Sequence, residues 1–95
     1  MRDLLLVSAV RLTDASPRDV RRGLVGYVTC VLNGSVHLEV TLRRTRKGRP
    51  AISFPTRRDA HGREHAIVRL LRLDDRRSIE WQVFLALGIS VEATQ

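Results

Sequence analysis

Arginine side chains are the residues of this sequence whose type and spacing best suit chemistry, and most of them gather in one segment. Ten basic residues lie from Arg43 to Arg72, with only two acids, Asp59 and Glu64, among them, so this segment carries a charge of +8. The other 65 residues hold seven bases and eight acids. The planar fork of arginine makes paired hydrogen bonds to phosphate or to the edge of guanine. The segment therefore predicts a local surface that binds a polyanion.

Three groups of basic residues can be distinguished within this segment. The candidate nucleic-acid-binding residues are Arg44, Arg46, Lys47 and Arg49 in the first group, Arg57 and Arg58 in the second, and Arg63 in the third. The first two groups flank a short predicted strand over 51–54, whose ends would be about 13 Å apart. Charges at that separation can contact two or more phosphates. The alternative is a solvated strand edge, because charged residues at an edge prevent aggregation.

Other kinds of chemistry find little support in the sequence. It contains no glycine-rich phosphate loop, nucleophile motif or paired-cysteine spacing. Cys30 and His37 are expected to be cross-strand neighbours, but a metal site needs three or four ligands. His61 and His65 are separated by a turn at Gly62. We therefore expect no metal, no cofactor, no small-molecule substrate and no enzymatic activity.

Length and composition limit the class of protein. The 95 residues suffice for a single domain spanning 1–95, and 43% hydrophobic with 28% charged residues is typical of a soluble globular chain. The net charge of +7 leaves nucleic acid, an acidic lipid surface or an acidic protein as candidate partners. The single cysteine excludes an internal disulfide. The apolar run Leu4–Val7 is too short for a signal peptide or a membrane span, so a cytoplasmic protein is expected.

Hydrophobic patterning predicts mostly strands. Strands are expected over Leu4–Leu12, Leu24–Leu32, Ser35–Thr45, Ala51–Phe54 and His65–Leu73, with polar connections over 13–22 and 55–64. The last part of the chain fits two patterns, because Ile79, Trp81, Val83 and Leu85 alternate as in a strand while Ile79, Val83 and Leu87 have helical spacing. Its length favours a helix of about three turns, with Asp74 or Asp75 as N-cap and Gly88 as the stop.

The Asn33-Gly34 pair predicts a hairpin with a two-residue turn, which places Leu32 opposite Ser35. In that register every residue that the strand after the turn contributes to one face is apolar, and this face is expected to face the core. Its pairs are Val31 with Val36, Thr29 with Leu38, Tyr27 with Val40, and Val25 with Leu42. Tyr27 and Phe54 then belong to the core, and few aromatic side chains remain exposed to stack on bases. Duplex is therefore expected rather than a single strand.

The middle of the chain resembles the stage V sporulation protein G (SpoVG) family of bacterial regulators. The resemblance begins at Val7–Leu12, which is similar to the opening strand of that family, and the hairpin from Tyr27 to Leu42 takes the place of its second and third strands. Residues 48–58 resemble its short strand followed by a Met-Pro-Ser-basic-basic motif, with Phe54 in place of the methionine. Residues 59–64 resemble its Asp-Gly turn, and His65-Ala66-Ile67 resembles its His-Pro-Ile. The similarity covers roughly residues 7 to 87.

This resemblance implies both a fold and a function. The fold would be α+β, a curved antiparallel β-sheet of about five strands with a C-terminal α-helix. Members of the family are homodimers, formed through the sheet, that bind DNA and in some cases RNA. They are linked to transcription regulation, sporulation, septation and virulence. By position, Thr56, Arg57 and Arg58 match the motif implicated in binding. The alternative is a basic module that docks an acidic protein partner.

Overall fold

The computed structural model describes residues 5–89, which form an α+β fold of two sheets and two helices. A four-stranded antiparallel sheet has the order β1 (Val7–Asp14), β2 (Leu24–Leu32), β3 (Val36–Arg44) and β4 (Pro50–Ser53). Strands β5 (Thr56–Arg58) and β6 (Glu64–Ala66) pair separately as a two-stranded ribbon. The helices are α1 (Pro17–Val20) and α2 (Leu73–Leu87). The expected fold class is confirmed, although the main sheet has four strands.

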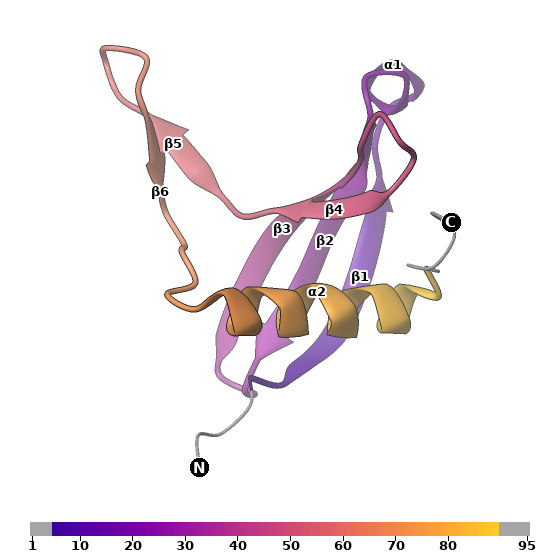
Figure 1. Ribbon diagram of the computed structural model, residues 1–95, viewed down its shortest axis with the longest axis vertical. Coiled ribbons are helices and arrows are strands. Elements are labelled where there is room, and N and C mark those ends of the chain that lie inside the picture. Colours follow the sequence, from indigo (N-terminus) through magenta and orange to yellow (C-terminus); the bar gives the residue numbers. More distant parts are fainter. Residues whose placement is uncertain (1–4, 90–95) are drawn as a thin grey trace.

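Helix α2 crosses one face of the four-stranded sheet, and the core lies between them (Figure 1). The buried side chains come from three strands and the helix: Val28, Cys30, Leu38, Val40, Leu42, Ile52, Ile79, Val83 and Phe84. Burial of each larger apolar side chain contributes about 1.5–3 kcal/mol relative to leaving it exposed. The apolar face of the sheet is thus covered by α2 from the same chain. Within residues 5–89, no helix has the length and apolar character needed to cross a membrane.

The helical interpretation of the C-terminal segment is confirmed, but its N-cap was predicted wrongly. The helix begins at Leu73, and Arg72 occupies the cap position without a side-chain hydrogen bond to the helix. Asp74 and Asp75 lie inside the first turn, where their charge is favourable to the helix dipole. The predicted stop is confirmed, because Gly88 adopts a left-handed conformation at φ 70° and its N–H donates to the carbonyl of Leu85.

The register of the β2–β3 hairpin differs by one residue from the prediction. Asn33 and Gly34 have the expected positive φ angles, and the Ser35 N–H donates to the Leu32 carbonyl at 2.9 Å. However, the ladder pairs Leu32 with Val36, so Ser35 is an additional residue between the turn and the strand. Asn33 is hydrogen-bonded to Leu6, the residue before β1. Its Oδ1 accepts from the Leu6 N–H at 2.7 Å, and its own N–H donates to the Leu6 carbonyl at 2.8 Å.

This one-residue shift exchanges the two faces of β2, because successive side chains of a strand point to opposite sides. Cys30 pairs with Leu38 and Val28 pairs with Val40, and all four are buried. Tyr27, which was expected in the core, is 42% exposed. His37 pairs with Val31, so the predicted Cys30–His37 neighbourhood is wrong. The predicted core face was correct for β3 and reversed for β2.

The segment after β4 also differs from the prediction. Residues 55–64 were expected to be a loop and 65–73 a strand, whereas β5 and β6 form a ribbon that projects away from the sheet (Figure 1). The Ile67 and Val68 N–H groups both donate to the Pro55 carbonyl, at 3.0 and 3.4 Å, which closes the ribbon at its base. Residues 67–72 then lead irregularly into α2.

The first strand and the connection that follows it needed smaller corrections. Strand β1 begins at Val7, and Leu4, the predicted start, lies outside the described residues. The connection expected over 13–22 contains helix α1. Ser16 caps this helix through its side chain and Pro17 follows at the first helical position, a start signal that the sequence carried.

Candidate nucleic-acid interface

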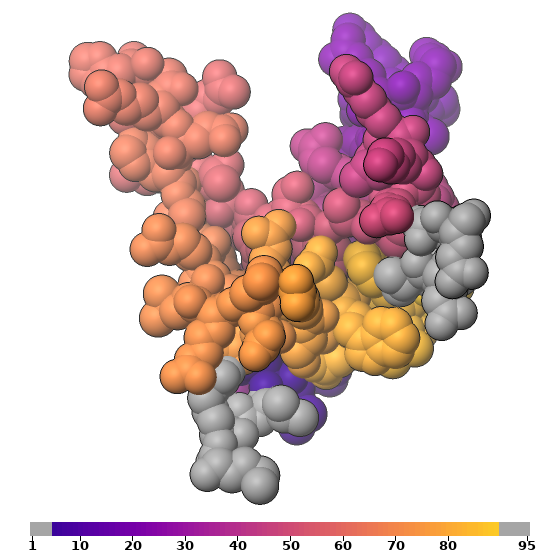
Figure 2. Space-filling model, in the orientation of Figure 1, coloured from indigo at the N-terminus to yellow at the C-terminus, as the bar shows by residue number. Residues whose placement is uncertain are grey.

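The predicted basic residues lie on two separate hairpins, some on the strands and some at the tips. The β3–β4 tip comprises residues 45–49, and the β5–β6 tip comprises residues 59–63. The first tip precedes β4 and the ribbon follows it, so the two basic groups do lie beyond opposite ends of that strand, as expected. Figure 2 shows the two arms standing apart with a hollow between them. The structure therefore separates the candidate residues into two sites of different charge.

The β3–β4 tip is a tight turn that exposes its basic side chains. The Thr45 N–H donates to the Arg49 carbonyl at 2.9 Å, and the Gly48 N–H donates to the Thr45 carbonyl at 2.9 Å. Gly48 has a φ of 79°, a conformation that favours glycine. The Arg44 guanidinium donates to the Gly48 carbonyl at 3.0 Å across the turn. Arg46 and Lys47 lie at the two corners of the turn and are exposed.

The β5–β6 tip has the same hydrogen-bond pattern. The Asp59 N–H donates to the Arg63 carbonyl at 3.0 Å, and the Gly62 N–H donates to the Asp59 carbonyl at 3.1 Å. In each tip the first residue also offers a side-chain oxygen to the arginine N–H four residues later. These contacts are Thr45 Oγ1 with Arg49 at 3.2 Å and Asp59 Oδ1 with Arg63 at 3.0 Å. Both tips have a Thr or Asp at the first position, Gly at the fourth and Arg at the fifth. This repeated pattern is present in the sequence but was not used in the prediction.

Asp59 organises the β5–β6 tip. Its Oδ2 lies 2.7 Å from Nε2 of His65, and its Oδ1 also accepts from the His61 N–H at 2.8 Å. The hydrogen bond to His65, together with those from the Arg63 and His61 N–H groups, lowers the pKa of the Asp59 carboxyl. This carboxylate therefore stays charged and is part of the turn. It places a negative charge at the tip that was expected to bind phosphate.

The ribbon is nearly neutral for a second reason. Arg58 pairs with Glu64 across the ribbon, and their side chains approach to 3.8 Å. Residues 56–66 contain three arginines and the two acids Asp59 and Glu64, a net charge of +1. Arg57 and Arg58 are adjacent on β5 and so extend toward opposite faces of the ribbon. They were predicted to lie in a loop and grip phosphates together, but the structure places them on a strand and does not bring them together.

Thr56 and Arg57 lie at the base of the ribbon. Thr56 pairs with Ala66 and Arg57 pairs with His65, and both side chains are exposed. Within residues 5–89, Arg57 has no ion pair or side-chain hydrogen bond, which distinguishes it from Arg58. The Arg63 guanidinium at the tip likewise makes no such contact within residues 5–89, so Arg57 and Arg63 are the ribbon residues best placed to contact a phosphate.

Three arginines that were not among the predicted binding residues lie at the same end of the molecule as the β3–β4 tip. Arg18, Arg21 and Arg22 belong to α1 and the turn that follows it. The Arg44 N–H donates to the Gly23 carbonyl at 2.7 Å, and Arg43 pairs with Leu24, which joins the α1 turn to the end of β3. The pairing of Leu24 with Arg43 was predicted, so the placement of the preceding arginines could have been inferred from it.

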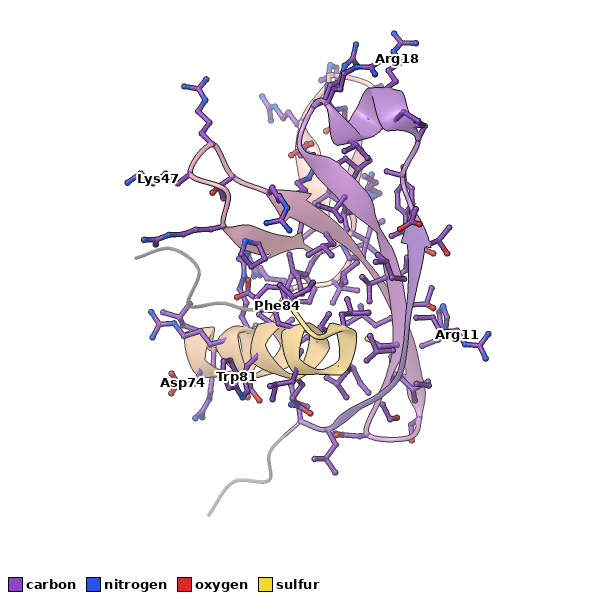
Figure 3. The ribbon with its side chains drawn as sticks, turned by 90° about the vertical axis from the view of Figure 1, so that its right-hand side faces the viewer. Arg11, Arg18, Lys47, Asp74, Trp81 and Phe84 are labelled. Carbon is purple, nitrogen blue, oxygen red and sulfur yellow. The ribbon has the colours of Figure 1, made fainter. Side chains whose placement is uncertain are left out.

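The surface formed in this way is named the basic end. It comprises Arg18, Arg21, Arg22, Arg43, Arg44, Arg46, Lys47 and Arg49. Over residues 16–23 and 43–49 there are eight basic side chains and one acid, Asp19, which gives a charge of +7. Asp19 accepts a hydrogen bond from Ser16 at 3.0 Å within α1. Figure 3 shows Arg18 and Lys47 extending from this end in different directions, so the charge is broad rather than confined to one flat patch.

Aromatic and sulfur groups lie elsewhere. Tyr27 is on the sheet face opposite α2, and Trp81 is 52% exposed on the outer side of α2. Phe54 packs partly against the core, as predicted, with the Arg76 guanidinium 5.6 Å from its ring centre. Burial raises the pKa of the Cys30 thiol beneath α2. Among residues 5–89, no three side chains of histidine, cysteine, aspartate or glutamate come together as metal ligands would.

No protein-family model, curated protein or solved structure matches this chain.

Proposed function

We propose that this chain is a small nucleic-acid-binding regulatory protein of the SpoVG type, which acts as a homodimer and contacts phosphates chiefly through the basic end. The observation that carries the proposal is the charge of +7 gathered from two separate segments at one end of the molecule. Such a concentration of charge attracts polyanions over several ångströms and accelerates their encounter with the protein. Arginine supplies seven of these eight bases, and its fork suits phosphate.

Duplex DNA is the favoured partner. The basic side chains lie on tight turns and on a short helix, which hold their backbone positions at the surface. Tyr27 and Trp81 are exposed, but they lie on other surfaces and offer no continuous platform for stacking successive bases next to the basic end. Phosphate contact along a backbone therefore accounts for the arrangement better than single-strand stacking does.

The family resemblance supports the regulatory role. The antiparallel sheet with a C-terminal helix agrees with the fold that the resemblance implies. The positions that match the family motif, Thr56, Arg57 and Arg58, lie on the ribbon, which would provide a second and weaker phosphate contact. Regulation of transcription, as in sporulation or septation, is the corresponding cellular role.

The test is a binding titration across salt concentrations with duplex DNA, single-stranded DNA and RNA of equal length. Counterion release predicts that log affinity for duplex falls linearly with log salt, with a slope of about −0.9 per phosphate contacted. Affinity for duplex that does not change with salt would contradict phosphate binding. If none of the three nucleic acids binds near physiological salt, the proposal is wrong and docking to an acidic protein becomes the better explanation.

A further inference from the structure

The outer side of α2 carries a row of exposed side chains that the proposed function does not use. Leu73, Arg77, Trp81 and Leu85 follow one another at four-residue spacing and so form a single ridge along the helix. Leu73, Trp81 and Leu85 are 60%, 52% and 60% exposed, although the helix buries Ile79, Val83 and Phe84 on its other side. Figure 3 shows Trp81 on the side of α2 that faces away from the sheet.

The arginine in this ridge differs from its neighbour. Arg76 is held against the protein, because its guanidinium donates to the Ile52 carbonyl at 3.3 Å, lies 3.9 Å from Glu80 and contacts the Phe54 ring. Arg77 is exposed and forms no hydrogen bond or ion pair with any other residue between 5 and 89. A free guanidinium between two apolar side chains of one ridge can stack on an aromatic ring.

The order of residues in the ridge is self-complementary. When two such helices lie antiparallel about a two-fold axis, Leu73 faces Leu85 of the partner copy, and Arg77 faces the partner's Trp81. Each contact occurs twice, as an isologous interface requires. The apolar ends therefore meet apolar ends, and each guanidinium meets an indole ring. Ridges at four-residue spacing are the surfaces that most often pack together between helices in globular proteins.

We propose that a second copy of this chain docks on the ridge, and that the homodimer of the proposed function forms through antiparallel α2 helices, not through the sheet as the family resemblance implies. The apolar face of the sheet is already covered by α2, whereas the opposite sheet face carries polar side chains such as Arg11, Thr13 and Glu39. Leu71, two residues before α2, is 88% exposed and adds a further apolar side chain near the N-terminal end of the helix. This addition matters because a stable interface needs about 800 Å² per partner.

Trp81 is the sole tryptophan, so its fluorescence reports on dimer formation at the ridge. Dilution of the full chain should shift Trp81 emission to the red as the dimer seen by sedimentation equilibrium dissociates. Leu85→Glu and Arg77→Glu should each raise the dissociation constant about tenfold or more. Leu85→Glu places a carboxylate against a leucine, and Arg77→Glu replaces a cation that the ring face attracts with an anion that it repels. Val20→Glu is the matched control, since Val20 is 51% exposed on α1 and not on α2, and it should dimerise as the unmodified chain does.

Cysteine cross-linking tests the antiparallel arrangement directly. Positions 73 and 85 are about 18 Å apart along one helix, so Leu73→Cys or Leu85→Cys alone should not cross-link under oxidation. A mixture of the two variants should give a disulfide-linked pair, and the native Cys30 is 1% exposed and should not interfere. Cross-linking of either variant alone, or no cross-linking of the mixture under conditions where the chain sediments as a dimer, would overturn the arrangement.

This inference rests on the proposed function, but the two can fail separately. A chain that remains monomeric at all concentrations and still binds duplex DNA would overturn the α2 interface alone. A dimer with the predicted cross-links that binds no nucleic acid would overturn the proposed function alone. If a glutamate variant loses its helical circular dichroism, the cross-linking experiment decides instead. Leu73→Cys and Leu85→Cys replace exposed side chains, and the circular dichroism of each variant alone shows whether it folds.

Discussion

The backbone N–H of Arg44 donates to the carbonyl oxygen of Gly23 at 2.7 Å, and this bond joins the two basic segments of the chain. Gly23 has a φ of 93°, and a side-chain carbon there would lie 3.0 Å from the Arg44 carbonyl oxygen. The turn after α1 therefore passes close to the end of β3. As a result, Arg21 and Arg22 lie at the same end of the molecule as Arg46 and Lys47, although more than twenty residues separate them in the sequence.

Substitutions at the basic end are expected to weaken binding more than substitutions in the ribbon. Arg21→Ala with Arg22→Ala should reduce affinity for duplex DNA and lower the magnitude of the salt slope by about 0.9 for each phosphate that the variant no longer binds. Arg57→Ala with Arg58→Ala should have a smaller effect, because Arg58 is already paired with Glu64. Both can be measured by fluorescence anisotropy with labelled duplex.

Arg11→Ala is the control for that comparison, because Arg11 lies on the side of the sheet away from α2 (Figure 3). It should leave the affinity and the salt slope nearly unchanged. A larger loss from the ribbon pair than from the Arg21–Arg22 pair would show that the ribbon, and not the basic end, carries the main phosphate contacts.

Protonation of Asp59 at acid pH should weaken the hydrogen bonds that hold the β5–β6 tip. The pKa of this carboxyl is lowered by its hydrogen bonds to His65 and to the Arg63 and His61 N–H groups. Its stabilising contribution is therefore fully present above the unfolded-state pKa of about 3.9, and is lost as pH falls through the lower folded-state value. The amide resonances of His61 and Arg63, followed by NMR between pH 6 and the acid range, should report this loss.

Asp59→Asn should remove the acid transition in those resonances, since the amide does not titrate. Glu64→Gln provides the comparison, because it removes a carboxylate from the same ribbon without touching the turn. Persistence of the transition in Asp59→Asn would assign it to another group.

Gly26 is expected to tolerate no side chain. A carbon added there would lie 2.4 Å from the Thr13 carbonyl oxygen, closer than such atoms approach in proteins. Gly26→Ala should therefore lower the free energy of unfolding by about 1–3 kcal/mol, because β1 must move away from β2. Urea denaturation measures the change. Ser35→Ala, at an exposed position of the hairpin, should stay within about 0.5 kcal/mol of the unmodified chain.

The same variant links stability to the candidate site. Gly26 pairs with Asp14 at the end of β1, immediately before the segment that leads into α1. Displacement of β1 should therefore also weaken duplex binding at temperatures where the protein remains folded. Loss of stability with unchanged binding would show that the position of α1 does not depend on this contact.

Local signals in the sequence determined much of the fold. The span Leu24–Leu32 was predicted with its observed bounds, because it is rich in β-branched residues and precedes Asn33-Gly34. The length of the C-terminal apolar pattern and Gly88 predicted α2 and its end. The charge excess between residues 43 and 72 identified the β3–β4 tip. These features depend on residue type and short-range spacing, which a sequence displays directly.

The faces and the site were decided by tertiary structure. Asn33 bonds to Leu6, and Ser35 remains outside the ladder, so a one-residue change in register turned Tyr27 outward and Cys30 into the core. The charge of the ribbon depended on Asp59 and Glu64 lying beside its arginines, while Arg21 and Arg22 joined the basic end through the Gly23–Arg44 contact. Register and long-range contact arise from competition among distant parts of the chain, and local pattern does not encode the outcome.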